Sequence, residues 1–272
     1  MGRRIGIIAG SGILPFLMLE KVQKKGFACG VIGLRGETDP SLENEADEFQ
    51  WVEGGAVSDI ISFFKKNRMH EVLIAGKVDQ RRILEKEKLN HSLLPLLQRI
   101  KEKTPTSVIK VMIDFFNQEG IHIVDPSPFL SSYLCQEGVM TEIKPSLELE
   151  DDINLGMRMA KRIADLDLGQ TVVIKEGAIL AVEAMEGTDE TIRRGGQLAG
   201  KGFLVVKAGR SSQDMKIDLP GVGLRTVEIL VKAGGKALCI EAQKVLFFQK
   251  EKAISLANGN KVLIMAKEYR DT

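Results

Sequence analysis

The stretch Ile5-Gly-Ile-Ile-Ala-Gly-Ser-Gly-Ile-Leu-Pro15 decides the fold of the first part of the chain. Its aliphatic half, Ile5 to Ala9, is typical of a buried strand and stops at the flexible turn Gly10-Ser11-Gly12. Pro15 favours the first turn of a helix, and apolar residues then recur at helical spacing from Phe16 to Lys25. The stretch therefore predicts a strand, a glycine turn and a helix.

Aliphatic runs and helical patterns continue to alternate beyond this stretch, which predicts a parallel sheet covered by helices on both faces. The expected strands and helices of this first region are strands at 29–34, 71–75 and 121–124 and helices at 56–66, 91–99 and 107–118. We expect residues 1–134 to form an N-terminal Rossmann-like, nucleotide-binding domain. The acidic segment 135–150, which contains Pro145, is predicted to be a linker.

Residues 151–272 predict a second, C-terminal α/β domain. Its expected elements are helices at 153–164, from Asp189 onward and at 222–232, and strands at 171–175, 178–182, 203–207, 236–240, 245–248 and 262–265. Two domains also fit the length of 272 residues, because a typical domain has roughly 100 to 200.

The composition excludes several classes of protein. There are 38 Lys and Arg against 37 Asp and Glu, a net charge of +1, so no excess of cations is available to bind nucleic acid. The three cysteines are widely spaced within or beside apolar runs, which favours buried thiols and a reducing cytoplasm. Arg3 and Arg4 precede an apolar run as in a signal peptide, but Glu20 and Lys21 end that run without a cleavage site. We expect a soluble cytoplasmic protein.

The glycine turn has two interpretations. Free N–H groups at a helix N-terminus favour an anionic phosphate, but the same glycines also suit a tight turn alone. The pattern is not a clean dinucleotide fingerprint, because its third glycine would fall at Pro15 and Arg35 stands where an acidic residue is expected. Lys77 comes directly after Gly76 at the end of a predicted strand. It is interpreted either as a cation that binds phosphate or as a solvated side chain.

Three carboxylates, Glu183, Glu186 and Asp189, follow the predicted strand at 178–182. Carboxylates at a strand exit are well placed to reach a cleft. The alternative is that Thr188 caps a helix whose first turn contains Asp189. That alternative explains Glu183 less well, because its neighbours are apolar.

The most polar loop runs from Lys207 to Gly223 and contains Arg210, Gln213, Asp214 and Asp218. Carboxylates and cations gathered at the end of a strand are what a metal-assisted phosphoryl site requires. The alternative is a solvated loop whose Asp218 caps the following helix. No spacing of the histidines or cysteines indicates a zinc site or a cysteine nucleophile.

Several segments resemble the bacterial UDP-2,3-diacylglucosamine pyrophosphatases of lipid A synthesis, in the form unrelated to the metallophosphoesterases. Two of these segments are specific to the family: Ala181-Val-Glu-Ala-Met-Glu-Gly-Thr-Asp189 and Gln213-Asp-Met-Lys-Ile-Asp-Leu-Pro220. The family pattern is also matched by the glycine turn, by Gly76-Lys-Val78 and by Asp165-Leu-Asp-Leu-Gly-Gln-Thr-Val-Val173. The resemblance implies a hydrolase that depends on Mg²⁺ or another divalent cation and binds its substrate between two α/β domains. It implies release of UMP and 2,3-diacylglucosamine 1-phosphate, known as lipid X.

The resemblance makes Asp218 essential for metal-assisted catalysis. We expect Asp214 or Glu183 to share the metal or activate water, with Asp214 and Asp218 as the metal ligands. From the residue patterns and the resemblance together, we predict these substrate contacts: Gly10, Ser11, Gly12, Ile13, Leu14, Lys77, Glu186, Thr188, Asp189, Lys207, Arg210 and Gln213. A lipid-linked sugar nucleotide would bring the enzyme to the inner membrane face, and the family resemblance alone implies a homodimer.

Two other functions compete with this one. The glycine turn in an alternating α/β domain also suits an NAD(P)-dependent oxidoreductase, although its fingerprint is incomplete. A non-catalytic module that binds a sugar nucleotide would use the same residues without turnover.

Overall fold

A computed structural model describes residues 2–53, 56–77, 105–216 and 218–270. The chain forms two compact units. The first comprises Met1–Phe129 together with Asp214–Asp218, and the second comprises Leu130–Gln213 and Leu219–Thr272. The helix predicted at 91–99 lies outside the described residues. Both units are α/β, so the predicted fold class is confirmed.

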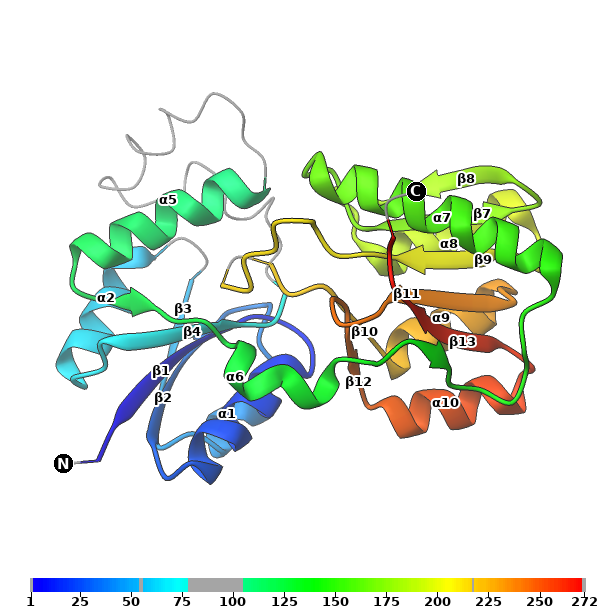
Figure 1. The fold of residues 1–272 in the computed structure, drawn as a ribbon. Coiled ribbons are helices and arrows are strands. Elements are labelled where there is room, and N and C mark those ends of the chain that lie inside the picture. Colours follow the sequence, from blue (N-terminus) through cyan, green and yellow to red (C-terminus); the bar gives the residue numbers. More distant parts are fainter. Residues whose placement is uncertain (1, 54–55, 78–104, 217, 271–272) are drawn as a thin grey trace. The chain divides into compact units, whose positions relative to one another are not determined.

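The first unit is built on a five-stranded parallel sheet in the order β3-β2-β1-β4-β5. The strands are β1 (Arg4–Ala9), β2 (Ala28–Leu34), β3 (Glu48–Val52), β4 (Glu71–Ala75) and β5 (His122–Ile123). The helices are α1 (Leu14–Lys24), α2 (Val57–Lys66) and α5 (Pro105–Gln118), and a 3-10 helix spans Pro40–Asn44. Helices α2 and α5 share one face of the sheet, and α1 packs on the other (Figure 1).

Amphipathic spacing explains why α2 forms where it does. Val57, Ile60, Ile61 and Phe64 recur at helical intervals and are buried against the sheet. Lys65 and Lys66 lie in the last turn, where cations suit the negative end of the helix dipole.

The strand order places a topological switch point between β1 and β4. From β1 the chain builds outward to β2 and β3 on one side, and β4 and β5 lie on the other. In open parallel sheets, ligands bind at the carboxyl ends of the strands at such a point. The loops at that point begin at Gly10, after β1, and at Gly76, after β4.

The second unit contains a six-stranded mixed sheet in the order β6-β13-β11-β9-β7-β8. Its parallel centre consists of β9 (Leu204–Lys207), β11 (Ala237–Glu241) and β13 (Leu263–Lys267). The antiparallel strands are β6 (Gly138–Val139), β7 (Thr171–Lys175) and β8 (Ala178–Val182). A separate parallel pair joins β10 (Gly221–Gly223) to β12 (Leu246–Phe248).

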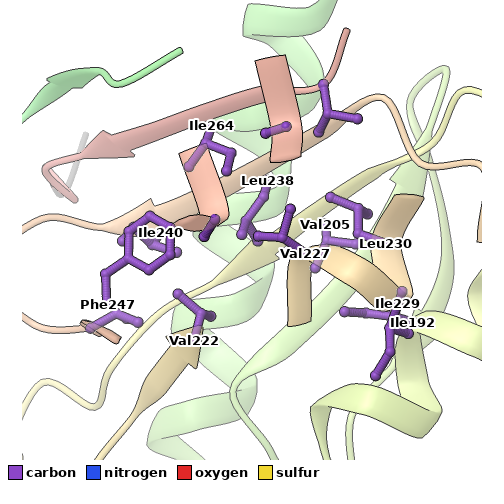
Figure 2. Close-up of a cluster of buried hydrophobic side chains, with 14 of the residues drawn as sticks. Ile192, Val205, Val222, Val227, Ile229, Leu230, Leu238, Ile240, Phe247 and Ile264 are labelled. Atoms are coloured by element: carbon purple, nitrogen blue, oxygen red, sulfur yellow. The ribbon is translucent and has the colours of Figure 1, made fainter. Parts of the chain in front are cut away.

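Helices cover both faces of this second sheet. The long helix α7 (Leu147–Asp165) packs on one face through Ile153 and Met157. On the other face lie α8 (Thr188–Ala199), α9 (Leu224–Ala233) and α10 (Lys250–Gly259), with Ile192, Val227 and Leu230 in a buried cluster (Figure 2). The chain passes from the first unit to the second within α6 (Ser127–Leu130), and a 3-10 helix, Ser131–Tyr133, follows in the second unit.

The structure adds elements that the sequence did not predict. Helix α10 buries only Ala253 and Ala257 of its ten residues, so it has little apolar periodicity to detect. Residues 135–150, predicted as a linker, contain β6 and the first turn of α7, both in the second unit. The three cysteines are buried and free, as expected. Among the described residues, no helix combines the length and apolar character needed to span a membrane.

Candidate active site

The glycine turn after β1 is joined to the loop after β4 by backbone hydrogen bonds. The Ser11 amide donates to the Lys77 carbonyl at 2.7 Å, and the Lys77 amide donates to the Ser11 carbonyl at 3.0 Å. This pairing needs glycine at two positions. A β carbon on Gly10 would lie 2.3 Å from the Lys77 carbonyl oxygen, and Gly76 has a φ of +95°. The two loops are therefore joined into one edge.

Helix α1 begins directly beyond this edge. Its N-cap residue, Ile13, provides no capping side chain, and the first turn contains no acidic residue. Gly12, Ile13 and Lys77 are exposed, whereas Gly10 and Leu14 are buried. The positive end of a helix dipole and an exposed cation thus occur on the two joined loops, an arrangement that favours an anion.

Glu183 lies in a buried polar network at the carboxyl end of β8. Its Oε1 accepts from the Thr188 hydroxyl at 3.0 Å, and its Oε2 accepts from the backbone amide of Gln170 at 3.2 Å. The Lys207 ammonium lies 3.5 Å from Oε2. The Lys207 side chain is 5% exposed and the Glu183 side chain 10% exposed. Burial explains why this carboxylate needs a cation beside it.

The same network occupies the Lys207 ammonium. Besides Glu183 it donates to the hydroxyls of Thr188 at 2.9 Å and Thr171 at 3.2 Å, so its three protons have partners inside the fold. Burial alone would raise the pKa of Glu183, but the Lys207 ammonium and the neighbouring donors outweigh it and hold that pKa below its ordinary value. Glu183 is therefore a buried carboxylate anion.

The remaining residues of the acidic segment have different surroundings. Glu186 is exposed and pairs with Arg194 at 2.5 Å, while Asp189 pairs with Arg225 at 3.1 Å. Thr188 is the first residue of α8, whose N-cap is Gly187, so the predicted Thr188 cap is wrong, whereas Asp189 does lie in the first turn of the helix, as that alternative predicted. The Thr188 hydroxyl is used by Glu183 and Lys207 instead.

Asp214 and Asp218 lie on the same turn of the loop between β9 and β10. The Asp218 amide donates to the Asp214 carbonyl at 3.1 Å, and Asp214 Oδ1 accepts from the Lys216 amide at 3.0 Å. Asp214 is exposed and Asp218 is half-buried. Helix α9 has Gly223 as its N-cap, paired with Thr226, so the alternative in which Asp218 caps it is wrong.

Two carboxylates at the end of α7 hold the beginning of this loop. Asp165 accepts from the Ser211 amide at 2.7 Å and from its hydroxyl at 2.8 Å. Asp167 pairs with the Arg210 guanidinium. Sequence reasoning missed this role, although Asp165 and Asp167 stand in one of the motifs that carried the resemblance.

Gln213 closes the same segment on itself. Its Oε1 accepts from the Arg210 amide at 2.8 Å, across three residues. Of the predicted loop contacts, Arg210 and Gln213 therefore shape the loop itself. In the part of the chain that the structure describes, no group of three His, Cys, Asp or Glu side chains forms a ready-made metal cage.

Both halves of the chain match models of known protein families. Residues 4–133 match the LpxI N-terminal domain, and residues 136–265 match the LpxI C-terminal domain. The chain belongs to the LpxI family. The resemblance drawn from the sequence motifs is thereby confirmed, and the match covers both units of the fold.

A relative of this LpxI family member comes from Caulobacter vibrioides. It is the UDP-2,3-diacylglucosamine pyrophosphatase LpxI, 29% identical over 279 residues, which covers 99% of each chain. The similarity therefore extends over both proteins from end to end.

Solved structures give weaker similarities to this LpxI family member. A pyruvate carboxylase from Rhizobium etli is 11% identical, with a TM-score of 0.31 over 46% of this chain and 11% of that one. The N5-carboxyaminoimidazole synthetase from Staphylococcus aureus, complexed with ADP, is 18% identical, with a TM-score of 0.25 over 65% and 39%. These scores are too low to support an inference.

Proposed function

We propose that this protein hydrolyses the diphosphate bond of UDP-2,3-diacylglucosamine in lipid A synthesis, releasing UMP and 2,3-diacylglucosamine 1-phosphate. The observation that carries the proposal is the turn in which the Asp218 amide donates to the Asp214 carbonyl, in a chain that matches both LpxI domains. The activity named for the Caulobacter vibrioides relative supports the substrate.

The loop carboxylates suit a divalent cation that is shared with substrate. Mg²⁺ is commonly held by one or two carboxylates together with substrate phosphates and water, rather than by a full protein cage. The carboxylate oxygens of Asp214 and Asp218 are hard ligands of the required kind, and neither residue is fully buried. When bound, the cation would neutralise charge on the diphosphate.

Asp218 has the surroundings expected of the principal ligand or base. A half-buried carboxylate is less fully hydrated than an exposed one, and its charge acts more strongly on groups nearby. In the proposed reaction, water adds to the phosphorus on the glucosamine side and loses a proton to one of these carboxylates. The bond from that phosphorus to the bridging oxygen breaks, and UMP leaves.

The first unit supplies a suitable place for the nucleotide phosphate. The α1 N-terminus at Gly12 and Ile13 and the exposed Lys77 lie at the switch point of a Rossmann-like sheet. Glu183 and Lys207, by contrast, neutralise each other in a buried network. We propose that this pair orders the end of β8 rather than contacting phosphate.

The chemistry of the proposed substrate also suggests where the protein works. Two acyl chains would hold that substrate at the inner membrane face, so we propose a cytoplasmic enzyme in peripheral contact with that surface. The predicted homodimer stays a prediction.

Incubation with UDP-2,3-diacylglucosamine and Mg²⁺ in heavy-oxygen water tests the reaction. We expect UMP to appear and EDTA to stop its release. The heavy oxygen should enter 2,3-diacylglucosamine 1-phosphate and not UMP, since attack is on the glucosamine side. Absence of UMP would overturn the assignment, and label in UMP would overturn the site of attack.

A further inference from the structure

The second unit contains another buried ion pair, Lys161 with Glu241, which plays no part in the chemistry proposed above. Lys161 of α7 places its Nζ 3.0 Å from Oε1 of Glu241, the last residue of β11. The two side chains are 7% and 6% exposed. Lys161 also lies over the ring of Tyr269, 5.6 Å from its centroid.

Both charged groups hold a single residue, Gly209, at the start of the loop after β9. Lys161 Nζ donates to the Gly209 carbonyl at 2.9 Å, and the Gly209 amide donates to Glu241 Oε2 at 2.8 Å. The peptide groups on either side of Gly209 are therefore each fixed by a buried charge. Charge-assisted hydrogen bonds of this kind are shorter and stronger than neutral ones.

Fold stability alone gives little reason for such a pair. Removing two charges from water costs several kcal/mol per ion, and well-packed apolar replacements of similar size are often neutral or stabilising. The clusters around it already fill both faces of the sheet with apolar side chains. What the pair adds is a fixed position for the Gly209 backbone.

Fixing Gly209 fixes the base of the whole loop. A β carbon at Gly209 would lie 3.1 Å from Gln213 Oε1 and 3.7 Å from Pro220 Cγ, so the two ends of the loop meet there. Pro220 is tied in turn by the Leu246 amide, which donates to its carbonyl at 2.9 Å. Between Gln213 and Pro220 lie Asp214 and Asp218.

We propose that Lys161 and Glu241 are positioning residues, which set the base of the loop and thereby the placement of Asp214 and Asp218. This inference rests on the proposed function. The pair touches neither substrate nor cation in this account. It acts only through the backbone of Gly209.

The test replaces the pair with apolar side chains of similar size, in the double variant Lys161→Met and Glu241→Leu. We expect kcat to fall about 100-fold, because misplacing reacting groups by about 1 Å costs that much. We expect KM to stay within about threefold, since the groups that bind nucleotide are unchanged. Hydrogen exchange of the amides that lie within 208–220 should accelerate by about tenfold or more, as the Gly209 anchors are lost; Pro220 itself has no amide hydrogen.

Asp152→Asn is the matched control. Asp152 is a buried carboxylate on the same helix, and it accepts from the amides of Glu176 at 3.0 Å and Gly177 at 2.7 Å. It holds a turn between β7 and β8, not the loop after β9. We expect this variant to lose thermal stability while keeping the wild-type kcat and the wild-type exchange at 208–220.

Two results would overturn the positioning role. One is a double variant with wild-type kcat and wild-type exchange of the loop. The other is an equal loss of kcat in Asp152→Asn, because a general loss of stability would then suffice. If wild type releases no UMP, the proposed function fails, while the exchange measurement still tests whether the pair holds the loop.

Discussion

Ser11 and Lys77 exchange two backbone hydrogen bonds, of 2.7 Å and 3.0 Å, although they follow different strands. The Ser11 hydroxyl adds a third, to the Lys77 carbonyl at 3.0 Å. Because β1 and β4 are neighbours at the switch point, this bridge joins the two loops on which the nucleotide phosphate is proposed to bind. The position of Lys77 thus depends on the glycine turn.

Gly10→Ala should break this bridge. The new β carbon would lie 2.3 Å from the Lys77 carbonyl oxygen, so the backbone of one loop must move. Overpacking of this kind costs about 1–3 kcal/mol. Chemical denaturation should show that loss in the free energy of unfolding. Gly2→Ala is the control, because nothing lies within 4 Å of its β carbon, and equal stability of the two variants would contradict the account.

Lys77→Ala tests the proposed phosphate contact. The side chain is exposed, so we expect the fold to keep its stability. Affinity for UMP should fall about tenfold, the effect of one charge-assisted hydrogen bond of roughly 1.5 kcal/mol. Titration calorimetry measures it, with the exposed Lys66→Ala as control. Equal UMP affinity in both variants would remove Lys77 from the site.

Glu183 and Lys207 should behave as one unit in stability measurements. Glu183→Gln leaves the Lys207 ammonium buried without its counter-charge, which costs about 3–5 kcal/mol. The double variant Glu183→Leu and Lys207→Met removes both charges and should lose less than the sum of the single losses. A double-mutant cycle from denaturant unfolding tests this. Additive losses would show that the two groups are not coupled.

The pH dependence of that loss has a predictable sign. The pKa of Glu183 is held below its ordinary value of 4.5 in the fold, so its charge stabilises the protein above that value. The contribution fades as the pH falls from there through the folded pKa. The gap in unfolding free energy between wild type and Glu183→Gln should thus be widest near about pH 7 and shrink below about pH 4. A gap that widens on acidification would contradict this assignment.

Local patterns predicted much of the fold, and they failed where the pattern was short or weak. The strands at 171–175 and 178–182 were found with their observed bounds, because aliphatic runs flank a clear turn. Strand β3, by contrast, begins with Glu48, has Gln50 between its apolar Phe49 and Trp51, and lies at the sheet edge. Its alternation is too short to stand out.

In the candidate active site, too, local sequence patterns revealed single residues but not the partners that they meet in the fold. The apolar neighbours of Glu183 marked it as an unusual carboxylate, but its partner Lys207 lies 24 residues away. Lys161 and Glu241 are 80 residues apart. Such pairs arise only when helix and strand are packed, so periodicity and spacing in one sequence do not reveal them. The roles of Asp214 and Asp218 remain proposals.

The most direct test of the central claim is the rate of UMP release from UDP-2,3-diacylglucosamine by wild type and by Asp218→Asn. The substitution keeps the size of a half-buried loop side chain and removes its charge, so thermal stability should be preserved. We predict that kcat falls about 100- to 1000-fold, the loss typical of removing one electrostatic group from the transition state. Wild-type turnover by Asp218→Asn would contradict the account.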